Sequence, residues 1–146
     1  MSKIIPEKIS IFYVKVYKSN HSSTEEYLDK PIKPANIKVQ LSQNSAFNLD
    51  EKNIRIRLEV ILNGVDEQDK EIGIHGEYGI EFQLHVDNFE EYVINDNGEN
   101  KINNELGITA LSIVYSTARG IILERTQSTL LNGVILPIVD PMELIK

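Results

Sequence analysis

The chain contains no cysteine and no tryptophan among its 146 residues. Without cysteine it can form no disulfide, no thiolate zinc site and no cysteine nucleophile. A chain of this length can bury a core large enough to fold without such cross-links, so we expect a single domain over residues 1–146. The absence of cysteine also suits a reducing compartment, and we expect a cytoplasmic protein.

Basic residues are scarce, with 15 Lys and Arg against 22 Asp and Glu and a formal net charge of −7. A nucleic-acid binder draws most of its affinity from a basic surface, so nucleic acid is excluded as the partner. The first residues lack the apolar segment of a secretion signal. The most apolar stretch, residues 106–123, contains Arg119 and several hydroxyl side chains, which favours a buried helix over insertion into a membrane.

Residues that could bind a metal ion or act in catalysis are also too few, or too far apart, to form a site. His75 and His85 are ten residues apart on one predicted strand, about 33 Å, too far to share a metal ion. Glu77 and Glu81 would lie about 13 Å apart, beyond the reach of a paired carboxylate mechanism. We therefore expect no enzyme, no cofactor and no metal. The two glutamates are candidates for docking a basic partner, or they serve solubility alone.

The first two thirds of the chain alternate apolar and polar residues in the manner of strands. The pattern is clearest over residues 54–63 and 72–86, which predict a long hairpin with one apolar and one polar face. Residues 9–17 and 37–42 predict two further strands, joined by a polar connection over residues 19–36. Three glycines in the last strand predict a bulge or a close backbone approach: Gly73, Gly76 and Gly79.

Residues 103–126 predict one long helix that is apolar on two flanks. A helix on one sheet needs only a single apolar stripe, and at about 36 Å this helix would expose a large second one. A partner subunit is the simplest cover for it. The candidate interface residues are Ile108, Leu111, Ile113, Tyr115, Ile121 and Ile122. The fold class is α+β: a four-stranded antiparallel sheet covered by one long C-terminal helix plus a short apolar tail.

Residues 95–100 predict a turn, and residues 130–146 an apolar tail without regular structure. Pro137 and Pro141 prevent a long helix or a central strand in the tail. An apolar segment of this kind must pack against something or bind something. The candidate substrate-binding residues are Ile138, Met142, Leu144 and Ile145.

The helix and tail resemble SecB, the tetrameric bacterial export chaperone. In the helix, the pattern Leu-Gly, Ile, aromatic, Ala-Arg, Ile is matched by Leu106-Gly107, Ile113, Tyr115, Ala118-Arg119 and Ile122. In the tail, the closing motif is matched by Leu136-Pro137-Ile138-Val139-Asp140 and Leu144, and Tyr78-Gly79-Ile80 is similar to a step in the fourth strand. Pro141 and Ile145 stand where SecB has aromatic residues, so a groove here would be less aromatic.

The resemblance implies a homo-oligomer, a dimer of dimers with the long helices at its interface. It also implies grooves that hold unfolded or partly folded polypeptides without ATP, and a polar sheet face on which the translocation ATPase docks. The client would be exported proteins in general or a dedicated one, such as the antitoxin of a toxin–antitoxin–chaperone operon. Two alternatives stay open: an oligomeric adaptor for one specific protein partner, and a hot-dog thioesterase, whose helix normally follows the early strands.

Overall fold

Four long strands form one sheet, and the computed structural model describes residues 3–145 of the chain. The sheet strands are β1 (Ile9–Ser23), β2 (Asn36–Asn48), β3 (Asn53–Val65) and β4 (Glu71–Val86). A second small sheet pairs β5 (Val93–Asp96) with β6 (Glu99–Ile102). The helical elements are η1 (Pro6–Lys8), α1 (Glu26–Asp29), η2 (Phe89–Tyr92), α2 (Asn104–Arg125) and α3 (Pro141–Ile145).

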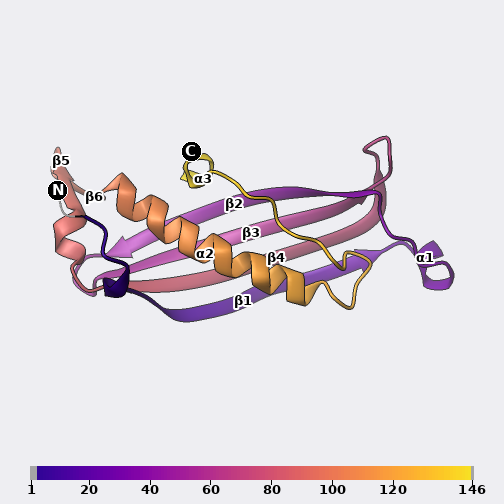
Figure 1. Ribbon diagram of the computed structural model, residues 1–146, viewed down its shortest axis with the longest axis horizontal. Coiled ribbons are helices and arrows are strands. Elements are labelled where there is room, and N and C mark those ends of the chain that lie inside the picture. Colours follow the sequence, from indigo (N-terminus) through magenta and orange to yellow (C-terminus); the bar gives the residue numbers. More distant parts are fainter. Residues whose placement is uncertain (1–2, 146) are drawn as a thin grey trace.

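The large sheet is antiparallel throughout, in the order β1-β4-β3-β2, so β3 and β4 are central and β1 and β2 form the edges (Figure 1). This confirms the four-stranded sheet expected from the alternation. Both edge strands run six residues further than the sequence pattern predicted, through Ser23 and Asn48. Their last residues are mostly polar because an edge strand faces solvent, and only backbone pairing to the neighbouring strand marks them as strand.

The two faces of the sheet differ as the alternation predicts. On one face, which we call the inner face, the side chains of β3 and β4 are buried and form most of the core, and α2 lies against them (Figure 1). On the other, outer face, the same strands carry polar side chains and no helix or strand covers them in the described part of the chain. The core residues of β3 and β4 include Ile56, Leu58, Val60, Leu62, Ile80, Phe82 and Leu84.

Helix α2 is capped at both ends by side chains. Asn103 accepts a hydrogen bond from the Glu105 amide at 2.6 Å, and the Thr126 hydroxyl donates to the Ile122 carbonyl at 2.9 Å. By length and apolar composition this helix would also suit a membrane span, but it lies on the sheet. Its seven buried residues are Leu106, Ala110, Leu111, Val114, Tyr115, Ala118 and Ile122.

The glycines of β4 mark close approaches and one irregularity of the ladder, as expected. A Cβ on Gly79 would come 2.6 Å from the ring of Tyr17, and Gly73 has a φ of +82°. The β3–β4 ladder is irregular around Gly73, between the pairs Asn63–His75 and Val65–Glu71. Two further register shifts, which the sequence did not predict, lie in β1, between Ile11 and Tyr13 and between Val16 and Lys18. β1 is an edge strand, which can bend without breaking a second ladder.

The segment between the sheet and α2 confirms the predicted turn and adds a hairpin. Asn97 and Gly98 both have positive φ, 53° and 85°, which is the type I′ turn that joins two paired strands. Strands of four residues are too short to show a periodic pattern, which is why β5 and β6 escaped prediction. The prediction that the tail lacks regular structure is wrong at its end, where α3 forms. Pro141 begins this helix because the first position of a helix needs no amide proton.

Candidate functional site

The tail runs back beside α2 and is fastened there through its backbone. The Tyr115 hydroxyl donates to the Pro137 carbonyl, and Arg119 Nε donates to the Leu136 carbonyl at 3.1 Å. Burial raises the pKa of Tyr115, so its hydroxyl remains a donor at neutral pH. Two side chains of the helix thus hold an extended chain by atoms that every polypeptide carries.

The tail side chains alternate between the core and solvent. Val134 and Leu136 are buried, whereas Ile135 is 66% exposed and Ile138 is 87% exposed. No helix or strand is formed over residues 134–140. This surface of the protein therefore already binds an extended segment of its own chain, with Val134 and Leu136 inserted and the carbonyls of Leu136 and Pro137 accepting hydrogen bonds.

Beyond the tail, a hollow of about 250 Å³ lies between β2 and the first half of α2. It is mainly apolar, and its lining residues include Phe47, Ile54, Ile56, Ala110 and Leu111. Gly107 also lines it, and a Cβ built there would meet nothing within 4 Å. Pockets for whole small molecules are typically about 300–1,000 Å³. The hollow is therefore suited to inserted side chains of a longer chain.

One polar atom in this hollow is left without a partner. Gln43 lines it, and its Oε1 atom is buried with no hydrogen-bond partner among residues 3–145. A buried acceptor of this kind is costly unless something donates to it. A backbone amide of an extended chain bound in the hollow would be a suitable donor.

Apolar side chains that α2 does not cover are also exposed on the opposite edge strand, β1. The helix crosses the inner face obliquely, so part of β1 is left open (Figure 1). On that strand, Phe12 is 52% exposed and Val14 is 44% exposed. Leu28, on α1 in the connection between β1 and β2, is 78% exposed. Exposed large apolar side chains such as Phe12 and Val14 on one strand are typical of a surface that contacts other chains.

The predicted substrate-binding residues surround the groove but do not line the hollow. Ile138 is almost fully exposed, Met142 is 40% exposed and Leu144 is half-buried, while the side chain of Ile145 lies outside the described residues. Sequence reasoning missed Phe47 and Gly107. A helix is about 1 kcal/mol less stable with glycine than with alanine at an interior position. That cost is a sequence signal that could have identified Gly107 as a position where a side chain would fill a binding hollow.

The candidate interface residues of α2 divide into two groups. Leu111, Tyr115 and Ile122 are buried within the chain and offer no surface to a partner in this arrangement. Ile108, Ile113 and Ile121 remain half-buried. The sequence could not separate the two groups, because both flanks of the helix are apolar and only the tail and sheet decide which is covered.

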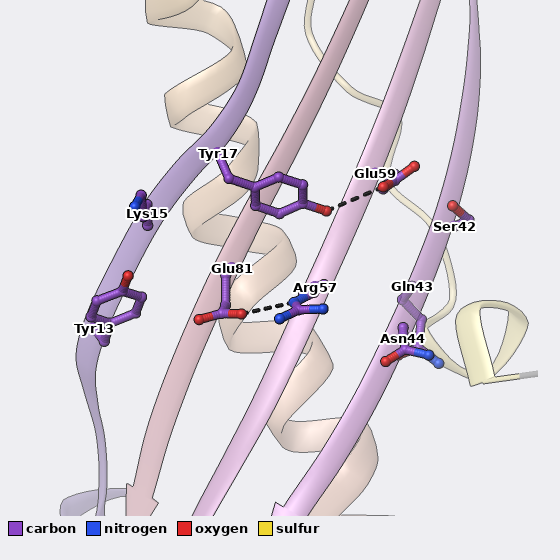
Figure 2. Close-up of a pocket in the computed structure, with 9 residues that line it drawn as sticks. All are labelled: Tyr13, Lys15, Tyr17, Ser42, Gln43, Asn44, Arg57, Glu59 and Glu81. Atoms are coloured by element: carbon purple, nitrogen blue, oxygen red, sulfur yellow. Dashed lines mark hydrogen bonds and ion pairs between the residues drawn. The ribbon is translucent and has the colours of Figure 1, made fainter.

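The outer face carries the predicted docking residues, and their carboxylates are engaged. Arg57 Nε donates to Glu81 Oε1 at 2.8 Å (Figure 2), and Gln83 Nε2 donates to Glu81 Oε2 at 3.0 Å. The hydrogen bond from Arg57, with the one from Gln83, holds the pKa of Glu81 below its usual value. Glu77 Oε1 lies 3.1 Å from His75 Nε2. Between residues 3 and 145 no three His, Asp or Glu side chains gather to hold a metal ion.

No protein-family model and no curated protein matches the chain. Among solved structures, the chain is similar to the SecB-like chaperone of Mycobacterium tuberculosis, determined in complex with a ChAD peptide from the HigA1 antitoxin. The TM-score is 0.57 at 10% identity, over 91% of each chain. The chain has a SecB-like fold.

A second solved structure, a protein of unknown function from Streptococcus agalactiae, aligns with a TM-score of 0.44 at 14% identity, over 89% of this chain and 97% of that one. The helix and the tail, where the sequence resembles SecB, both pack on the large sheet.

Proposed function

We propose that this protein is an ATP-independent chaperone that holds extended, unfolded polypeptide segments in the apolar groove between α2 and β2. The observation that carries the proposal is the tail, an extended segment whose carbonyls are held by Tyr115 and Arg119 beside a hollow of matching character. The neighbouring SecB-like chaperone was determined with an antitoxin peptide bound, which supports polypeptide as the ligand.

The energetics favour clients that are apolar and extended. Each apolar side chain fully removed from water contributes about 1.5–3 kcal/mol, and ordering the client opposes this gain. The small hollow near Gly107 accepts few side chains, so useful affinity requires contacts at several places along one client. The exposed side chains of the tail and of β1 supply such further contacts. Hydrophobic contact has no directional requirement, so different sequences can be held.

We further propose that the outward face of α2 packs against a second copy of the chain, giving a homo-oligomer. That face has no charged residue between Glu105 and Arg119, and Ser112 and Ser116 are exposed on it. A Cβ on Gly120 would meet nothing within 4 Å, so nothing within the chain requires this glycine. Small, uncharged side chains let a second helix approach closely.

The client class that we favour is a dedicated one, such as an antitoxin, over exported proteins in general. The support is the antitoxin peptide of the structural neighbour. On the outer face, the carboxylate of Glu81 is already engaged by Arg57 and Gln83, which weakens the case for docking a basic partner there.

The test is the replacement Gly107→Met, which puts a flexible apolar side chain at a position where an added Cβ meets nothing within 4 Å. We expect client affinity to fall about tenfold or more, because a buried client side chain is displaced. The fold should be kept or stabilised by up to about 1 kcal/mol through helix propensity. Binding is measured with a fluorescent unfolded client, and chaperone activity by light scattering of several unrelated aggregating clients.

The matched control is Gly120→Met, the same change on the outward face of the same helix. Its side chain is far from the hollow, so its expected effect is on sedimentation mass rather than on the groove. Unchanged client binding in folded Gly107→Met contradicts the groove assignment. Protection of only one client, with none for the others, identifies an adaptor instead of a chaperone. An unchanged mass for Gly120→Met contradicts the oligomer interface.

A further inference from the structure

The outer face of the sheet contains a second, larger hollow, on the side opposite the groove. It has a volume of about 610 Å³ and is open to solvent. Figure 2 shows its floor, with α2 behind the sheet and side chains of all four strands in front. Tyr13 and Lys15 come from β1, Glu81 from β4, Arg57 from β3 and Asn44 from β2.

The carboxylates of this hollow already have partners in the chain. Both oxygens of Glu81 accept hydrogen bonds, one from Arg57 and one from Gln83. Glu59 Oε1 accepts from the Tyr17 hydroxyl at 3.2 Å and lies 3.6 Å from Lys18 Nζ. Both oxygens of Glu81 and one oxygen of Glu59 are therefore engaged, and a basic ligand would have to compete with these bonds.

The cationic groups, in contrast, still have N–H donors that a ligand could use. Lys15 is exposed and takes part in none of the ion pairs seen between residues 3 and 145. Arg57 uses Nε for Glu81 and its side chain is still 46% exposed. Arg55, two residues along the same face, has a buried Nε without a partner in the described range. The hollow thus has donors and positive charge to offer, although the whole chain carries −7.

Two tyrosines stand at the same place. Tyr13 is 38% exposed and Tyr17 is 42% exposed, and Lys15 lies between them in sequence. Lys15, Glu81 and Arg57 are register partners across three strands, so the cationic groups flank one carboxylate on neighbouring strands. Exposed aromatic rings beside cations are a frequent arrangement in surfaces that bind protein segments.

We propose that this hollow binds an acidic peptide segment of a partner protein, with a carboxylate of the segment at the exposed ammonium of Lys15 and an apolar side chain against Tyr13 and Tyr17. The occupant is acidic because Glu59 and Glu81 already accept hydrogen bonds within the chain, whereas Lys15 is in no ion pair with the described residues and Arg57 is still partly exposed. The site is on the opposite face from the groove and does not depend on the chaperone proposal.

The test uses three fluorescent peptides of the same length, in which leucine alternates with glutamate, glutamine or lysine. Binding to the full chain is followed by fluorescence anisotropy at low and at physiological salt. We expect the glutamate peptide to bind about tenfold more tightly than the lysine peptide, and its affinity to fall as salt rises. The replacement Lys15→Glu should weaken the glutamate peptide about tenfold and strengthen the lysine peptide, because it reverses the charge at the site.

The control is Lys30→Glu, which makes the same charge change at the end of α1. It should leave the preference for glutamate intact. Gly107→Met in the groove should also leave it intact, so a failure of this site and a failure of the chaperone proposal are separable. Equal binding of the three peptides overturns the proposal, as does an equal loss in Lys30→Glu and Lys15→Glu. A sedimentation mass that falls in Lys15→Glu alone also overturns it, since the occupant is then a second copy of the chain.

Discussion

The inner and outer faces of the sheet are made by the same strands and differ in almost every physical respect. Leu58 and Glu59 are neighbours on β3, yet Leu58 is fully buried under α2 and Glu59 is held by surface hydrogen bonds on the outer face. The inner face is covered by a helix and by a tail, and an apolar hollow is left between the helix and β2. The outer face is open and carries paired charges.

Because of this difference, the inner face contributes mainly to the stability of the fold and the outer face mainly to the recognition of other molecules. Burial of the inner side chains supplies most of the free energy of folding, because hydrophobic burial is the dominant favourable contribution. Exposed ion pairs contribute little to stability, but they fix which charges the surface can still offer. We therefore expect inner-face substitutions to change folding and outer-face substitutions to change binding, and the following predictions test that division.

The largest expected effect is the loss of stability in Leu58→Ala. Removing a fully buried leucine side chain leaves a cavity and should lower the free energy of unfolding by about 2–5 kcal/mol. Its control, Glu59→Gln, is one residue away on the outer face and should cost under about 1 kcal/mol. Urea unfolding followed by circular dichroism measures both, at two protein concentrations because an oligomer gains apparent stability with concentration. Equal losses would contradict the division.

An intermediate effect is expected at Gly79, where the outer face is unusually tight. A Cβ there would lie 2.6 Å from the Tyr17 ring, so Gly79→Ala should force the ring away from Glu59 and cost about 1–3 kcal/mol. In a chain that already carries Tyr17→Ala the same change should cost much less, and the double-mutant cycle measures the coupling. If Gly79→Ala costs the same in both backgrounds, the ring contact is not the cause.

The smallest expected effect is the acid dependence that Glu81 confers. The hydrogen bond from Arg57 lowers its folded-state pKa, so its stabilisation is fully present above the unfolded-state pKa, about 4.3, and is lost as pH falls through the folded-state value. The difference in unfolding free energy between the wild type and Glu81→Gln should be constant from neutral pH to about 5 and shrink below about 4. A difference that grows in acid would contradict the ion pair as its source.

The sequence predicted the fold more completely than the site. Alternation over residues 54–63 and 72–86 fixed the central hairpin and its two faces, and the apolar flanks located α2 within one residue at each end. The bulges of β1 were not predicted, because an edge strand can gain a residue without changing its composition. Phe47 and Gly107 were not predicted as neighbours, since they are 60 residues apart and meet only where α2 crosses β2.

By itself, the sequence determined which side chains must leave water: the period of two in the strands and the apolar flanks of the helix assign each residue to a face without reference to any partner. Only the tertiary structure decided what those faces can hold. The angle at which α2 crosses the sheet leaves the hollow at Gly107, and strand register places Arg57 beside Glu81, 24 residues away. Both depend on contacts between distant segments, whose geometry no local pattern encodes.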